Sequence, residues 1–127
     1  GHAKALREGA KLAGHEVNLG ALMNTQLDIS FPGGKELLEF SSTLLGANVG
    51  ELNTARRNLE QTLGPAAVTA ASSIAASFSK NDRVANGSGI PAEPRMMDGA
   101  EDIREMLGLK KFRSAINTYR HLPEGHP

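Results

Sequence analysis

Apolar side chains recur every three or four residues along most of the chain. The two clearest stripes are made by Leu37, Phe40, Leu44 and Ala47, and then by Leu52, Ala55, Leu59 and Leu63. Residues three and four apart share one face of an α-helix, so each stripe predicts an amphipathic helix. No strand-like alternation of apolar and polar residues competes with this pattern. The sequence therefore predicts an all-α fold, a single-domain helical bundle of about six helices.

Glycine, proline and asparagine divide the pattern into separate helices. The run Phe31-Pro32-Gly33-Gly34 is the clearest break. Asn48 can cap the helix that follows the first stripe. Gly64 can end that helix, and Pro65 can be the first residue of the next one. Further helices are expected over residues 3–13 with a stop at Gly14, over residues 98–107 with Asp98 as the cap, and over residues 110–119. A weaker helical segment is expected over residues 16–25, a proline-bearing loop over residues 92–97, and a frayed tail after Leu122.

The stretch from Pro65 to Asn86 reads PAAVTAASSIAASFSKNDRVAN and predicts a long helix made largely of alanine and serine. Ala67, Ala71, Ile74 and Phe78 share one face of it. Small side chains let neighbouring helices approach closely. We therefore expect this helix at the centre of the bundle or at a contact between subunits, and Gly87-Ser88-Gly89 is expected to be its exit.

Composition narrows the classes of partner and chemistry. The chain has 127 residues, a length typical of one domain, and its 14 basic and 14 acidic residues give no net charge. Nucleic acid and anionic membranes are therefore poor candidates for partners. The chain contains no cysteine, so these residues supply no disulfide, thiolate nucleophile or cysteine metal site. No apolar run is as long as a membrane span, and a cytoplasmic location is expected.

The stretch from Glu36 to Pro91 resembles the C-terminal half of the alkylhydroperoxidase D-like superfamily, which includes the carboxymuconolactone decarboxylases and peroxidase-related proteins. The matching features are two helices followed by a long one that carries Phe78, then Asn81-Asp82-Arg83, and closes at Gly89-Ile90-Pro91. With the flanking segments, the resemblance covers about two-thirds of the chain. It implies a helical domain that commonly assembles as dimers, trimers or hexamers.

The start of the chain, Gly1-His2-Ala3-Lys4-Ala5-Leu6-Arg7, resembles the end of the same family's redox motif, Cys-x-x-Cys followed by three residues and a histidine. If the match holds, the two cysteines lie just ahead of Gly1. The resemblance then implies thiol-based reduction of a small-molecule peroxide, with His2 activating or positioning a thiol. Gly1-His2 also fits the remnant of a purification tag, and we keep this alternative open.

The candidate site residues are therefore His2, as the catalytic residue, and Asn81, Asp82 and Arg83, as pocket-lining or structural residues. For the Asn-Asp-Arg triplet, a buried hydrogen-bond network or a subunit contact is favoured over an active site. His15, His121 and His126 are expected to be inert. The four histidines show no i, i+4 pairing, so no metal or cofactor is expected.

Two functions from different classes follow. The first is a peroxidase-related enzyme whose dithiol lies ahead of Gly1. The second is a cysteine-free helical protein that acts through its surface as a homo-oligomer. Residues ahead of Gly1 decide between these two functions, because thiol chemistry needs a dithiol that the printed chain lacks.

Overall fold

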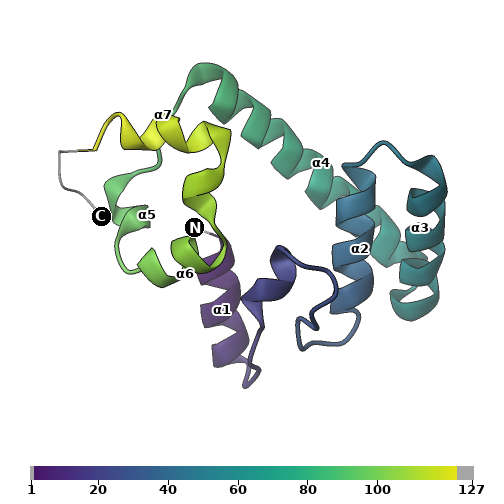
Figure 1. The fold of residues 1–127 in the computed structure, drawn as a ribbon. Coiled ribbons are helices and arrows are strands. Elements are labelled where there is room, and N and C mark those ends of the chain that lie inside the picture. The colour runs from purple at the N-terminus through teal and green to yellow at the C-terminus, as the bar shows by residue number, and fades with distance from the viewer. Residues whose placement is uncertain (1, 123–127) are drawn as a thin grey trace.

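The computed structural model describes residues 2–122, and every regular element in that range is a helix (Figure 1). The α-helices are α1 (His2–Leu12), α2 (Gly34–Leu44), α3 (Val49–Leu63), α4 (Pro65–Ser88), α5 (Pro94–Met97), α6 (Glu101–Met106) and α7 (Ile116–Tyr119). Three single turns of 3-10 helix are η1 (Leu19–Leu22), η2 (Leu109–Lys111) and η3 (Arg113–Ala115). The predicted all-α class is confirmed for this part of the chain, with seven α-helices where about six were expected.

The four longest helices begin within one residue of their predicted starts, and α1, α3 and α4 end close to the predicted glycines, but α2 ends at Leu44, before Ala47 of its predicted stripe. Gly14, with φ 77°, follows the end of α1, and Gly89, with φ 68°, ends α4. The side chain of Asn48 caps α3 by accepting hydrogen bonds from the backbone N–H groups of Gly50, at 3.0 Å, and Glu51, at 3.2 Å. Such a cap satisfies donors at a helix start that no carbonyl of the same helix can reach.

The predicted helical segment over residues 16–25 is wrong in extent, because only the turn η1 forms. Asn18 has extended backbone angles, and its side chain accepts a hydrogen bond from the backbone of Gly20 at 3.0 Å. Asn24 does the same for the backbone of Gln26, also at 3.0 Å. Both asparagines thus offer the backbone a local partner that replaces helical hydrogen bonding.

The predicted cap at Asp98 is also wrong. Asp98 has extended backbone angles, Gly99 follows with φ 63°, and α6 begins only at Glu101. Ahead of it, the stretch expected to be a loop contains the one-turn helix α5, which begins with Pro94 and places the buried Met97 at its end.

The single helix predicted over residues 110–119 is broken into η2, η3 and α7. Phe112 has extended backbone angles and separates the two 3-10 turns. Contacts with the end of α4 hold this segment in place. The hydroxyl oxygen of Thr118 accepts a hydrogen bond from the backbone of Ala92 at 2.9 Å, and Arg120 donates one to the carbonyl of Gly89 at 3.3 Å. The tail expected to fray begins at residue 123 and lies outside the described residues.

One core lies where α2, α3 and the first half of α4 meet, on the right of Figure 1. Phe40, Ala55 and Leu59 are buried at its centre, and Leu59 has no exposed surface. Ala67 and Ala71 of α4 pack around them. The two apolar stripes of the sequence therefore meet each other, as amphipathic helices in a bundle do.

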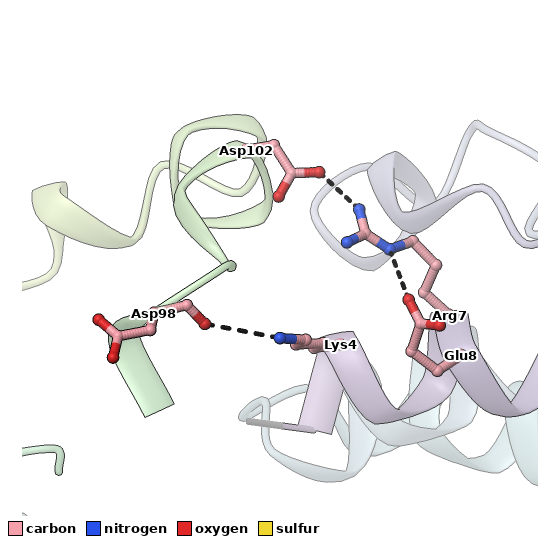
Figure 2. A network of polar contacts seen from close by, with 5 residues as sticks. All are labelled: Lys4, Arg7, Glu8, Asp98 and Asp102. Carbon is pink, nitrogen blue, oxygen red and sulfur yellow. Dashed lines mark hydrogen bonds and ion pairs between the residues drawn. The ribbon is translucent and has the colours of Figure 1, made fainter. Parts of the chain in front are cut away.

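A second core joins the two ends of the described chain. Leu19 of η1 packs with Ile103 and Leu107 of the α6 segment, and Ala3 of α1 lies against them. Polar contacts border this core (Figure 2). Arg7 pairs with Asp102 at 2.6 Å and with Glu8 at 3.7 Å, while Lys4 donates a hydrogen bond to the carbonyl of Asp98 at 3.5 Å. The start of α1 is thereby fixed to α5 and α6.

The long helix α4 crosses between the two cores but is not buried in either. None of its residues is buried, and Ile74, Phe78 and Val84 keep 59%, 42% and 60% of their surface exposed. The expectation that this helix occupies the centre of the bundle is therefore wrong for the described chain. The apolar face predicted from the sequence is covered by α2 and α3 only in its first half. The other expectation, a contact between subunits, stays a prediction.

Candidate functional site

A groove of about 480 Å³ lies between α2 and the exposed half of α4. Leu37, Ser41 and Leu45 form its wall on the α2 side, and eight residues of α4 between Ala71 and Asn86 form the other wall. Most of its surface is apolar, because the α4 residues that face it follow helical spacing through Ile74 and Phe78. The groove is open along its length, so it can accept an apolar ligand or an apolar surface.

His2, the candidate catalytic residue, lies at the first position of α1 and contacts the α4 wall of this groove. The ring of His2 is edge-on to the ring of Phe78, with 4.8 Å between the centroids and 86° between the planes. Aromatic rings prefer this arrangement because the positive edge of one meets the negative face of the other. The contact brings the first turn of the described chain against α4, which the sequence alone did not predict.

The three residues of the Asn-Asp-Arg triplet do not all lie on the groove side of α4. Asp82 and Arg83 line the groove one turn beyond Phe78, whereas Asn81 does not. All three side chains are exposed, so they form no buried hydrogen-bond network within the described chain. The other favoured interpretation, a contact between subunits, stays a prediction. Nε of Arg83 donates a long hydrogen bond of 3.5 Å to the hydroxyl of Ser79. Neither Asp82 nor Arg83 forms an ion pair with another residue of the described range.

The side chains beside the groove differ in the chemistry that they offer. The imidazole of His2 can transfer a proton, Arg83 can hold an anion, and Phe78 with Ile74 can hold an apolar group. The thiol nucleophile that the family's chemistry needs is absent from the printed sequence, which contains no cysteine. Across residues 2–122, no group of three or more histidine, aspartate and glutamate side chains gathers in a way that could hold a metal ion.

Neither His15 nor His121 lines the groove. His15 follows Gly14 and is exposed, and its backbone N–H donates a hydrogen bond to the carbonyl of Ala10 at 2.9 Å. His121 is also exposed, and its Nε2 accepts a hydrogen bond from Nε of Arg120 at 3.1 Å. His126 lies outside the described residues.

Sequence reasoning missed one buried charge, Arg104 of α6. Its guanidinium contacts Glu101 at 3.5 Å and the sulfur of Met97 at 3.7 Å, and its Nε has no hydrogen-bond partner among the described residues. An adjoining pocket of about 340 Å³ is lined by Glu101, Arg104, Glu105, Gly108, Lys110 and Lys111. Acidic and basic side chains both line it, so its charge selects neither an anion nor a cation. No spacing in the sequence marks Arg104 as buried.

The α2 wall of the groove was missed as well. Leu37 was named as a member of the first apolar stripe, and Ser41 and Leu45 were not singled out. Only packing of α2 against α4 brings these three side chains opposite Ile74, and such a contact between separate helices leaves no local signal in the sequence. By contrast, the spacing of Ala71, Ile74 and Phe78 was enough to predict that they share a face.

Comparisons with known proteins identify no relative of this chain. No protein-family model, no curated protein and no solved structure matches the chain. The resemblance to the alkylhydroperoxidase D-like superfamily therefore stays a prediction. Among the described helices, none has the length and apolar character needed to cross a membrane.

Proposed function

We propose that this chain is the helical domain of a peroxidase-related protein of the alkylhydroperoxidase D-like superfamily. In this proposal it reduces peroxides by thiol chemistry, using a Cys-x-x-Cys that lies ahead of Gly1. The observation that carries the proposal is the contact between His2 and Phe78, with ring centroids 4.8 Å apart beside the groove that Asp82 and Arg83 line. A cytoplasmic location and self-association are parts of the same proposal.

The reaction needs two thiols and an external dithiol reductant. One thiolate attacks a peroxide oxygen, the O–O bond breaks, and the leaving alkoxide takes up a proton to become an alcohol. The attacking sulfur becomes a sulfenic acid. The second thiol then attacks that sulfur, water leaves, and a disulfide forms. The external dithiol returns the pair to its reduced state by exchange.

His2 supports this chemistry by its location. In the redox motif it would follow the second cysteine by four residues, so on a continuous helix both would lie on the same face, one turn apart. An imidazole there can take the thiol proton and later deliver it to the leaving alkoxide. The thiolate is the reactive form, so a lower thiol pKa raises its reactivity at neutral pH.

The groove suggests the class of peroxide. Its apolar lining around Ile74 and Phe78 suits the carbon skeleton of an organic hydroperoxide better than hydrogen peroxide, because burying apolar surface contributes roughly 25 cal/mol per Å². An organic hydroperoxide is therefore expected to show the lower KM.

The test is peroxide consumption by the intact encoded protein, with dithiothreitol as reductant and cumene hydroperoxide as substrate. His2→Ala should lower kcat/KM by about 10²-fold or more, the usual contribution of a positioned proton-transfer group. His15→Ala is the matched control, because His15 is an exposed histidine that does not line the groove, and it should keep wild-type activity. Equal activity of the two variants would remove His2 from the mechanism. An inactive intact protein would contradict the proposal.

The second candidate is a cysteine-free helical protein that acts by binding. The observation that favours it is the exposed apolar surface of α4, where Ile74 and Val84 keep 59% and 60% of their area accessible. Exposed apolar patches often mark interaction sites. The measured mass of the intact protein, compared with its encoded sequence, decides between the candidates. Cysteines ahead of Gly1 favour the enzyme, and an intact protein without them leaves only the binding function.

A further inference from the structure

Arg104 of α6 carries a buried charge that the chain itself satisfies only in part. The residue keeps 6% of its surface exposed. Its Nη1 donates a hydrogen bond to the sulfur of Met97 at 3.7 Å, and a thioether sulfur is a weak acceptor. Its Nη2 lies 3.5 Å from a carboxylate oxygen of Glu101, and its Nε has no hydrogen-bond partner among the described residues. A buried charge is costly unless it is paired and hydrogen-bonded, so this guanidinium can gain from a further anionic acceptor.

The unsatisfied edge of Arg104 matches a carboxylate. Nε and Nη2 of a guanidinium donate in the same direction, and together they can hold both oxygens of one carboxylate. Glu101 reaches this edge only at Nη2, and its side chain is 52% exposed. Both residues line the pocket of about 340 Å³ described above. When the exposed side chain of Glu101 turns away from Nη2, a ligand carboxylate can take its place.

The same pocket offers a place for a positive charge. Glu101 and Glu105 both line it and lie four residues apart, on one face of α6. Two like charges at this spacing destabilise a helix, and a cation between them removes the repulsion. Glu105 is exposed and forms no ion pair with another described residue. A positively charged group of a ligand is therefore expected beside Glu105.

The rest of the lining combines positive charge with apolar surface. Lys110 and Lys111 of η2 line the pocket, and neither forms an ion pair with another described residue. The four-carbon stems of lysines present apolar surface while their ammonium groups stay in water. Gly108, between α6 and η2 in the chain, also lines the pocket and has no side chain to fill it. This part of the pocket suits an apolar group attached close to a carboxylate.

We propose that this pocket binds a free α-amino acid with an apolar side chain. Its carboxylate lies on Nε and Nη2 of Arg104, and Lys111 adds positive charge beside it. Its ammonium group lies between Glu101 and Glu105. This inference concerns a pocket of α6 and η2, and it does not rest on the proposed redox chemistry.

The arrangement of the charges selects this class of ligand. Acidic and basic residues both line the pocket, so a ligand that carries one charge of each sign pairs with both, whereas a simple anion or cation leaves one set unpaired. Arg104 and Glu101 lie 3.5 Å apart at their closest charged atoms, so the two poles of the pocket are adjacent. The carboxylate and the ammonium group of an α-amino acid are also adjacent, because one carbon atom carries both.

Titration of the intact, isotope-labelled protein with L-leucine tests the site, with backbone amide NMR shifts as the readout. L-leucine should bind saturably, and the largest shifts should fall on Gly108, Lys110 and Lys111. The absence of saturable binding, or shifts confined to other parts of the chain, overturns the proposal.

Two truncated probes test the need for both charges. Isocaproate has the carbon skeleton and the carboxylate of leucine without the ammonium group, and isoamylamine has the ammonium group without the carboxylate. Each should bind at least about tenfold more weakly than L-leucine, because each leaves charged groups of the pocket unpaired. Isocaproate that binds as tightly as L-leucine would show a site for simple anions and would overturn the proposal. The same result with isoamylamine would show a site for simple cations.

Glu105→Gln tests the ammonium contact at an exposed position, where a defect in folding is not expected. It should weaken L-leucine binding about threefold or more, because the ammonium group loses a charged partner. It should leave the weaker binding of isocaproate unchanged. Glu60→Gln is the matched control, because Glu60 is an exposed glutamate of α3 that does not line the pocket. Equal affinity of the two variants for L-leucine would contradict the placement of the ammonium group.

Arg104→Gln tests the carboxylate contact and should weaken L-leucine binding about tenfold or more. Because Arg104 is buried, the helical circular dichroism signal checks that this variant folds. Lys111→Gln, at an exposed position, carries the same test if that variant does not fold, and it should weaken binding about threefold. Wild-type affinity in a folded Arg104→Gln protein, or in Lys111→Gln, overturns the proposed carboxylate contact.

Discussion

Arg7 of α1 and Asp102 of α6 form an ion pair across 95 positions of sequence, with Nη1 and Oδ2 2.6 Å apart. The pair joins the start of the described chain to its C-terminal part beside the core of Leu19 and Ile103. The hydrogen bond from Arg7 holds the pKa of Asp102 below the ordinary value of an aspartate, and a backbone hydrogen bond from Ile103 acts in the same direction. Both contacts favour the charged carboxylate.

This ion pair predicts how Asp102 titrates. In the folded state the pKa of Asp102 is lowered, so the ion pair stabilises the fold fully above the unfolded-state pKa of about 3.9. This stabilisation is lost as the pH falls through the folded-state pKa of Asp102. In an NMR titration of the carboxyl carbon, Arg7→Gln should raise the pKa of Asp102. Arg56→Gln, which changes an exposed arginine of α3, should leave it unchanged. The same pKa in all three proteins would show that the ion pair does not form in solution.

The core between α2, α3 and α4 depends on Leu59, which has no exposed surface. Leu59→Ala should lower the free energy of unfolding by about 2–5 kcal/mol, because it removes buried methyl groups and leaves a cavity. Leu63 lies one turn later on the same stripe and is 41% exposed, so Leu63→Ala should cost clearly less. Urea denaturation of both variants measures the difference. Similar losses would mean that the core is centred elsewhere.

Replacing Gly9 of α1 or Gly34 of α2 by alanine should change the stability of the protein in opposite directions. An added Cβ at Gly34 would overlap Cγ2 of Ile29, a side chain that is only 2% exposed. Gly34→Ala should therefore destabilise the protein by about 1–3 kcal/mol through overpacking. At Gly9, inside α1, an added Cβ meets nothing within 4 Å. Gly9→Ala should instead stabilise it by about 0.5–1 kcal/mol, and urea denaturation of the two variants checks the difference in sign.

The helices that could be predicted from the sequence are those with local signals at both ends. Asn48 caps α3, Gly64 separates α3 from α4, and Gly89 ends α4, as predicted. The segment after Gly108 could not be predicted, although Phe112, Ile116 and Tyr119 have helical spacing. Its path is set by contacts with distant residues, such as the hydrogen bond between Thr118 and the backbone of Ala92. Tertiary contacts of this kind override local preference.

The candidate site could be predicted only in part. The face containing Ile74 and Phe78, and the side chains of Asp82 and Arg83 beside it, follow from helical spacing within α4. The contact of His2 with Phe78 joins two helices far apart in the sequence, and no local pattern contains it. Burial of α4 was overestimated for a physical reason. Alanine and serine allow close packing, but they do not determine whether the neighbour is another helix of the same chain.

Counting thiols during a single turnover tests the proposed function most directly. The reduced intact protein would be mixed with one equivalent of cumene hydroperoxide in the absence of reductant, and its free thiols and the released alcohol would be measured. Thiol peroxidase chemistry predicts that two thiols per chain disappear and one alcohol forms, with the rate of loss much reduced in His2→Ala. An unchanged thiol count with the peroxide intact, or an intact protein with no thiol to count, would contradict it.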